Sequence, residues 1–312
     1  MQTAPNPAWL SVEDYKLPEG WANSKEKSAR TRESCELLES GNILHFSEPP
    51  FELPKDDREF LVSQPWSELK LHKNVSYRPG EDVLRGVAGD PATVNRVHSI
   101  LRNYSEHVLQ FAADFLAPYA GKWIVDFSSF RPLEEQGRDL PLHKRNDLLH
   151  VDAFPSRPTR GGRILRIFTN LNPSKVRVWN TTGPFDALAR KYAQDAGLGK
   201  FAAQSGLSRA LHAVSGMIGA GAAQRTPYDA FMLRFHDYLK ENSDFQANYP
   251  KSRLEFPPLA SWLVFTDGVA HAAMSGQYAL EQTLLIPPSA LVAPEHAPYR
   301  ILESIAGKPL VS

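Results

Sequence analysis

The stretch that most restricts the fold of this chain is residues 147–173, which read DLLHVDAFPSRPTRGGRILRIFTNLNP. Its middle part, residues 155–162, holds two prolines and two adjacent glycines, which are typical of turns. The part after the glycines is rich in apolar and β-branched residues, which favour strands. The stretch therefore predicts a strand, a loop over residues 155–162 and a second strand over residues 163–172.

The first of these strands carries the triplet His150-Val151-Asp152. Side chains alternate between the two faces of a strand, so the imidazole and the carboxylate point the same way and Val151 points the other way. With a second histidine, this pair makes the facial triad of two histidines and one carboxylate that suits Fe(II) and leaves positions open for a co-substrate and O2. The triplet also fits a surface histidine beside a turn aspartate, so the prediction depends on a third ligand.

His271 is the histidine that best completes the set. It follows Asp267-Gly268, a strong hairpin turn, and lies inside a pair of β-rich runs. In a jelly-roll barrel, this position brings it opposite His150 and Asp152.

Two other histidines remain as alternatives. His236 lies in the helical pattern RFHDYLKEN, and His143 precedes the ligand strand in a loop, where it can approach the metal without binding it. Without a metal, His271 would be a buried histidine that is bonded to the backbone.

Composition excludes several classes of protein. Lysine plus arginine equals aspartate plus glutamate, 35 each, which argues against a general nucleic-acid-binding protein. The single cysteine, Cys35, permits no intrachain disulfide. The chain begins without a basic and apolar leader, and it contains no apolar run of the roughly 18 residues that a spanning helix needs. We therefore expect a soluble cytoplasmic protein; the oligomeric state stays open.

The order of elements predicts an α+β fold. Asp90-Pro91 opens a clear helix that ends before Pro118, and the 25 prolines favour a loop-rich, β-containing fold over a helix bundle. We expect an N-terminal arm and helical cap over residues 1–120 and a double-stranded β-helix (jelly-roll) core over residues 121–290. A helical insertion spans about residues 185–250, a C-terminal segment spans residues 291–312, and the whole forms one structural unit.

The HVD triplet, an arginine-containing strand that ends in Leu-Asn, and a distal histidine after an Asp-Gly turn together resemble the Fe(II)/2-oxoglutarate-dependent dioxygenases. More narrowly, LLHVDAFPSRPTRGGRILRIFTNLNP followed by VRVW resembles the Kdo hydroxylases. This resemblance implies Fe(II), 2-oxoglutarate and O2 as cofactor and co-substrates. It also implies hydroxylation at C3 of the sugar acid Kdo in lipid A–Kdo, which forms Ko and releases succinate and CO2, by an enzyme peripheral to the inner membrane.

The resemblance further implies a basic residue that holds the distal carboxylate of 2-oxoglutarate inside the barrel. Residues 272–287, which follow His271, contain no arginine or lysine, so this residue must come from elsewhere. We expect Arg166, which shares a strand face with Asn170, and Arg163 and Arg177 are alternatives. The further residues expected to line the pocket are Trp179, Asn170 and Gln282.

Other functions stay open from the residues alone. The chain fits a 2-oxoglutarate-dependent hydroxylase of a protein or small metabolite, and a jelly-roll binding module without catalysis. A zinc hydrolase is a further alternative, although its usual HExxH signature is absent. Residues 196–223, with Lys200, Arg209 and Arg225 in or beside them, are either a contact with anionic lipid or a lid over the barrel.

Overall fold

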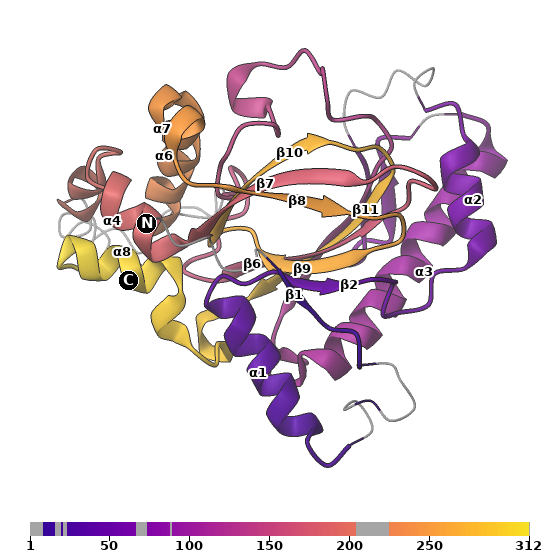
Figure 1. The fold of residues 1–312 in the computed structure, drawn as a ribbon, viewed down its shortest axis with the longest axis horizontal. Helices are drawn as coiled ribbons and strands as arrows, with labels where there is room; N and C mark the ends of the chain where they lie inside the picture. The colour runs from indigo at the N-terminus through magenta and orange to yellow at the C-terminus, as the bar shows by residue number, and fades with distance from the viewer. Residues whose placement is uncertain are drawn as a thin grey trace, which may run out of the picture.

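The computed structural model of the chain describes residues 9–15, 20, 24–66, 74–87, 89–203 and 225–311. Its α-helices are α1 (Lys27–Glu39), α2 (Lys55–Ser63), α3 (Pro91–Phe115), α4 (Phe185–Tyr192), α6 (Pro227–Glu241), α7 (Ser243–Asn248) and α8 (Pro298–Ala306). In Figure 1, α2 and α3 lie on the right of the β-core, and α4, α6, α7 and α8 gather at its left end.

The larger sheet forms one wall of the core and, apart from the parallel β1–β2 pair, is antiparallel. In pairing order its strands are β1 (Leu10–Ser11), β2 (Leu44–Phe46), β9 (Ser261–Phe265), β6 (Arg163–Asn170), β11 (Ala279–Ile286), β5 (Ile124–Arg131), β3 (Val75–Arg78) and β4 (Val83–Arg85). The smaller sheet pairs β10 (Val269–Ser275), β7 (Arg177–Pro184) and β8 (Ser252–Phe256) in that order.

The strands alternate side chains between two apolar layers. On the outer face of the larger sheet, Leu165, Ile167 and Leu280 pack in one cluster with the buried face of α3. On the inner face, Phe168 and Trp262 pack against side chains of the smaller sheet. Two facing sheets covered by helices confirm the predicted α+β jelly-roll fold.

Helix α3 begins and ends close to where the sequence predicts. The Asp90 carboxylate accepts hydrogen bonds from the backbone N–H groups of Ala92 and Thr93, both at 3.0 Å, and Pro91 occupies the first turn. The helix then lies on the sheet, with the Ser105 hydroxyl donating to Gln282 at 2.9 Å.

The division into cap, core and C-terminal segment stays a prediction, but two features bear on how the parts join. Strands β2 and β3, from the first 120 residues, pair with β9 and β5 of the barrel. Between β7 and β8 the structure describes α4, α6 and α7. Residues 204–224, which include Arg209 and most of the predicted stretch 196–223, lie outside the described residues.

The predicted ligand strand differs from expectation in one respect. His150 makes an isolated antiparallel bridge with His271, and residues 149–152 form no extended ladder. One edge of this short segment is paired with β10, and its other edge faces α6 and α7, whose side chains take the place of a neighbouring strand.

A buried ion pair joins the first residue of β6 to the turn before β10. Arg163 Nε donates to Asp267 at 2.8 Å, both side chains are 1% exposed, and Asp267 also accepts from the backbone N–H of Ile164. Burial raises the pKa of Asp267, opposed by the charge of Arg163. Removing one partner of such a pair leaves an uncompensated charge in the interior.

Arg163→Met should therefore lower the free energy of unfolding by about 3–5 kcal/mol, measured by urea denaturation. Arg253→Met is the matched control, because Arg253 pairs with Glu255 on an exposed part of β8 and such pairs contribute about 0–1 kcal/mol. Equal losses in the two variants would contradict this account of the buried pair.

Candidate metal centre

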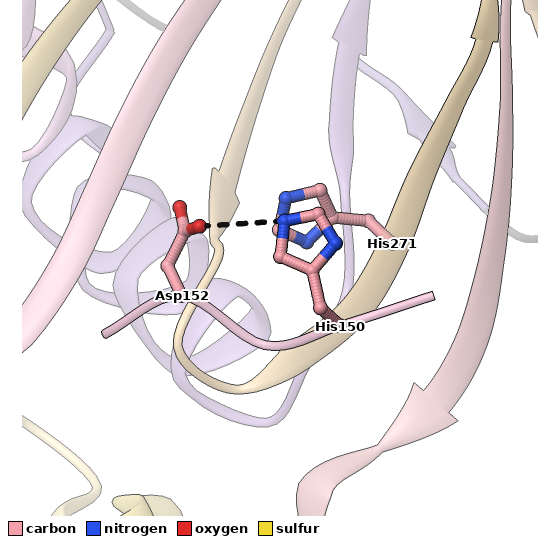
Figure 2. Close-up of side chains that lie close together, drawn as sticks. All are labelled: His150, Asp152 and His271. Carbon is pink, nitrogen blue, oxygen red and sulfur yellow. Dashed lines mark ion pairs between the residues drawn. The ribbon is translucent and has the colours of Figure 1, made fainter. Parts of the chain in front are cut away.

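Three side chains that are far apart in the sequence meet inside the barrel: His150, Asp152 and His271 (Figure 2). One potential ligand atom from each lies within 4.8 Å of the others, and His150 Nε2 is 3.7 Å from Asp152 Oδ1. Among the described residues, this is the one group of three or more such side chains with metal-binding spacing. The structure thus brings together the three predicted ligands, whose role in metal binding remains a prediction.

Backbone pairing fixes the relative position of these side chains. The N–H of His150 donates to the carbonyl of His271 at 3.1 Å, and the N–H of His271 donates back at 2.9 Å. Directly opposed residues of antiparallel segments project their side chains on the same side. The N–H of Asp152 donates to the carbonyl of Thr266 at 2.9 Å, which anchors the carboxylate-bearing residue next to the turn before β10.

The other edge of the ligand segment is satisfied by helix side chains. The Gln246 amide accepts from the N–H of Leu149 and donates to the carbonyl of the same residue, both at 2.9 Å. His236 Nδ1 donates to the carbonyl of Val151 at 2.8 Å. His236, the alternative third ligand, therefore holds the backbone between the two ligands of the HVD triplet, and its ring lies 4.9 Å from that of His150.

The protonation of the two histidines predicted as ligands follows from their hydrogen bonds. His150 Nδ1 lies 2.7 Å from the carbonyl of Leu148, and His271 Nδ1 lies 2.9 Å from the carbonyl of Val269. Because a carbonyl oxygen only accepts, each Nδ1 must carry the hydrogen. The Nε2 atom of each neutral ring keeps its lone pair, as a metal ligand requires.

The charge states of the three groups suit a divalent cation. Burial lowers the pKa of both histidines, and for His150 the neighbouring His271 adds to this effect. Burial raises the pKa of Asp152, but the charge of Arg166, followed by His271, outweighs it and holds that pKa well below its usual range. Two neutral imidazoles and one carboxylate are the protonation states in which these groups bind a metal.

Asp152 is also in contact with Arg166. Arg166 Nε lies 2.9 Å from Asp152 Oδ2, but neither atom has a hydrogen-bond partner among the described residues, because the N–H is not directed at the oxygen. The contact is therefore an ion pair without hydrogen-bond geometry. A buried carboxylate oxygen without a donor is an atom that a cation would satisfy. The donor set thus fits Fe(II), with its mixture of imidazole and carboxylate.

A pocket of about 100 Å³ opens beside the three residues. It is lined, in addition to them, by Arg131, Asn146, Arg166, Phe168, Arg177, Trp179 and Ala273. Trp179 stacks on the ring of His271, with centroids 5.1 Å apart, and Phe168 meets Trp179 edge to face. The predicted residues Arg166, Arg177 and Trp179 therefore all line the pocket.

The pocket has two ends with different partners. At the metal end, Arg166 contacts Asp152 and forms an ion pair with Glu281. At the other end, the buried Glu135 gathers cationic and amide side chains: its carboxylate lies 3.2 Å from Arg177, 3.8 Å from Arg131 and 3.3 Å from Asn146. Arg131 also donates from Nε to Glu281 at 2.8 Å, so Glu281 links the two ends.

Three other predicted pocket residues lie elsewhere. Arg163 pairs with Asp267 outside the pocket. Asn170 donates to backbone carbonyls at the end of β8, including that of Phe256 at 3.0 Å. Gln282 lies on the outer face of the sheet, where it bonds Ser105 of α3. None of the three lines the described pocket.

Several site residues were not predicted from the sequence: Arg131, Glu135, Asn146, Gln246 and Glu281. Arg131 and Glu281 are charged residues within strand-like runs, and such residues seldom enter a core unless they are paired. That signal was present in the sequence. No local pattern distinguishes Glu135, Asn146 or Gln246 as site residues.

Replacement of Gln246 by leucine should weaken Co(II) binding by about 10- to 100-fold, because the ligand segment loses both hydrogen bonds at Leu149. Titration of the cobalt absorption bands measures this, with His271→Ala as the benchmark for complete loss. Gln246→Glu keeps the hydrogen-bond acceptor but not the donor. Its Co(II) affinity should therefore lie between that of Gln246→Leu and that of the unchanged protein. Unchanged affinity in Gln246→Leu would show that β10 alone holds the segment.

The chain as a whole is similar to proteins of known family and structure. A family model described as 3-deoxy-D-manno-oct-2-ulosonic acid (Kdo) hydroxylase matches residues 21–309. A crystal structure of the Kdo hydroxylase KdoO, a non-heme Fe(II) alphaketoglutarate-dependent dioxygenase, in complex with cobalt(II) is 33% identical, with a TM-score of 0.81 and 98% of each chain covered.

A KdoO structure with alphaketoglutarate and Fe(III) is 32% identical, with a TM-score of 0.77 and coverage of 96% of this chain and 97% of that one. The apo structure of KdoO is 35% identical, with a TM-score of 0.78, over 93% and 94% of the two chains. No curated protein matches the chain. The family resemblance expected from the residues is confirmed.

Proposed function

Because the chain belongs to the Kdo hydroxylase family and is an Fe(II)/2-oxoglutarate-dependent dioxygenase, we propose that it hydroxylates C3 of Kdo while that sugar is attached to lipid A. The observation that carries the proposal is the match to this family over residues 21–309, together with a His–Asp–His set at one end of an arginine-lined pocket. The overall reaction consumes 2-oxoglutarate and O2 and yields succinate, CO2 and the hydroxylated sugar.

His150 Nε2, Asp152 and His271 Nε2 are the ligands in this proposal. When bound, Fe(II) supplies the site at which 2-oxoglutarate and O2 are activated for hydroxylation of a C–H bond. The chain's own part is to hold these ligands in their deprotonated forms. Trp179 and Phe168 wall the pocket with aromatic rings, which limits water beside the ligands.

We expect the two ends of the pocket to bind different parts of 2-oxoglutarate. Arg166 contacts the ligand Asp152, so it lies at the end where the keto acid group would bind. Arg177 is fully buried at the other end, and its Nε has no hydrogen-bond partner among the described residues. Burial lowers the pKa of Arg177. The charge of Glu135 raises this pKa, and the charge of Arg131 lowers it again. A second carboxylate beside Arg177 and Arg131 would balance this cluster.

We therefore assign the distal carboxylate to Arg177, with Arg131 beside it, and the metal end to Arg166. This differs from the sequence expectation, which favoured Arg166 for the distal carboxylate. The reason is position: the distal carboxylate lies at the opposite end of a five-carbon chain from the chelating oxygens, whereas Arg166 contacts a proposed metal ligand.

The lipid part of the substrate implies contact with a membrane surface. Among the described residues, no helix is long and apolar enough to cross a bilayer. Lys200 and Arg225 are exposed at the two ends of the undescribed stretch. We propose that Lys200 and Arg225 meet the anionic surface in which the lipid is embedded, at the cytoplasmic face of the inner membrane, by peripheral contact.

Aerobic incubation with Fe(II), 2-oxoglutarate and lipid A–Kdo tests the function. We expect succinate to form in step with a product that has gained one hydroxyl group on C3 of Kdo. Formation of succinate without a hydroxylated lipid would support the dioxygenase activity but contradict the proposed substrate. It would point to another substrate, such as a protein or a small metabolite.

Arg177→Met should raise the 2-oxoglutarate concentration needed for half-maximal succinate formation by about 10- to 100-fold, because one charge-assisted contact is lost. Arg166→Met should instead weaken Co(II) binding, because Asp152 loses the charge that keeps it ionised. If Arg166→Met instead binds Co(II) normally and needs more 2-oxoglutarate, Arg166 is the residue that binds the distal carboxylate.

A further inference from the structure

Arginine and phenylalanine side chains alternate on the way from the surface to the metal centre. Arg78 lies over the ring of Phe127, with Cζ 4.7 Å from the centroid, and Arg157 lies over the same ring at 4.1 Å. Arg157 also lies over Phe154 at 4.4 Å, and Arg166 is 5.9 Å from that ring. We call these five residues the arginine ladder.

The ladder joins the outer strands to the proposed ligands. Arg78 ends β3, Phe127 lies in β5, and Phe154 and Arg157 belong to the loop that follows Asp152. The side chains of Arg78 and Arg157 are 27% and 33% exposed, whereas that of Arg166 is 13% exposed and contacts Asp152. A solute thus meets Arg78 and Arg157 first, and the ladder ends at the metal end of the pocket.

The charges along the ladder are only partly compensated. Arg157 forms an ion pair with Asp126, whose other oxygen is buried without a hydrogen-bond partner among the described residues. Arg78 pairs with the exposed Glu81 at 3.2 Å, and its own Nε is buried without such a partner in the same part of the chain. Burial lowers the pKa of Arg157; Asp126 opposes this, and Arg166 and Arg78 add to it.

Stacking against rings also sets the direction of the donors. A guanidinium that lies over an aromatic ring keeps its N–H groups at its edge, in the plane where a carboxylate or phosphate can accept two of them. Arg157 lies over two rings, Phe127 and Phe154, and one of its N–H groups donates to Asp126.

The loop does not need Arg157 to hold its shape. Asp229 of α6 accepts hydrogen bonds from the backbone N–H groups of Thr159, at 2.7 Å, and Arg160, at 3.0 Å. The N–H of Gly162 donates to the carbonyl of Thr159 at 2.9 Å. These bonds hold the end of the loop independently of Arg157, and the ion pair of Arg157 with Asp126 does not account for the exposure of the arginine side chain.

We propose that Arg78 and Arg157 bind an oxyanion of the acidic sugar substrate, either the carboxylate of the sugar acid or a phosphate of its lipid. This inference rests on the proposed function and extends it to the substrate. It places the anion at the more exposed end of the ladder and leaves Arg131 and Arg177 to the co-substrate.

Equilibrium binding to the full chain, loaded with Co(II) and 2-oxoglutarate without oxygen, tests the proposal. The probes are lipid A–Kdo, its dephosphorylated form and a methyl glycoside of Kdo, followed by the change in tryptophan fluorescence. Arg157→Met and Arg78→Met should each weaken binding of lipid A–Kdo by about 10- to 100-fold. Arg157→Lys, which keeps the charge, should recover part of the affinity, and the remote exposed variant Arg253→Met should bind normally.

The probes separate the two sources of the anion. If Arg157→Met weakens binding of all three probes, the ladder holds the sugar carboxylate; if only the phosphorylated probe is affected, it holds a phosphate. Co(II) affinity and the 2-oxoglutarate requirement should not change, whereas a general disturbance of the site would alter them.

Two results overturn the inference in distinguishable ways. Unchanged binding of every probe by Arg157→Met and Arg78→Met, beside normal binding by the parent protein, refutes the ladder alone. A parent protein that turns over 2-oxoglutarate but binds none of the probes refutes the proposed substrate, and the inference falls with it.

Discussion

The reciprocal backbone pair between His150 and His271 is the contact on which the rest of the site depends. It joins two segments that are 121 positions apart in the sequence and places both imidazoles on one side. The pair is a single bridge rather than a ladder, so the ligand segment needs support on its other edge. Gln246 and His236 provide that support from the helices between β7 and β8. Helices α6 and α7 are therefore part of the framework of the candidate metal centre.

Much of the fold could be predicted because its signals are local. The Asp90 cap and the apolar spacing behind it define α3, and the Asp267-Gly268 turn places His271 at the start of a strand. The i, i+2 spacing of His150 and Asp152 requires only an extended backbone. Each of these inferences depends on residues close together in the sequence, where backbone geometry leaves few alternatives.

The pocket could not be predicted to the same depth, because strand alternation does not say which set of residues faces inward. In β11, Glu281 faces the pocket and Gln282 faces α3, yet both are polar and sequence alone gives no preference. The ion pairs are also long-range: Arg131 meets Glu281, 150 positions away. Such partners are set by tertiary packing, and only the need to neutralise a buried charge indicates that they exist.

For the proposed binding of Fe(II) and 2-oxoglutarate in this pocket, the charges of the pocket predict that the two bind together. Arg131, Arg166 and Arg177 are balanced by Asp152, Glu135 and Glu281 in a site with little exposure. A divalent cation alone would leave two uncompensated positive charges, and a dicarboxylate alone would leave two negative ones. Because uncompensated buried charge is costly, binding of either should strengthen binding of the other. Arg78 and Arg157 of the arginine ladder lie outside this balance, each beside one carboxylate, that of Glu81 and that of Asp126, and their remaining donors are the ones proposed to meet a third anion.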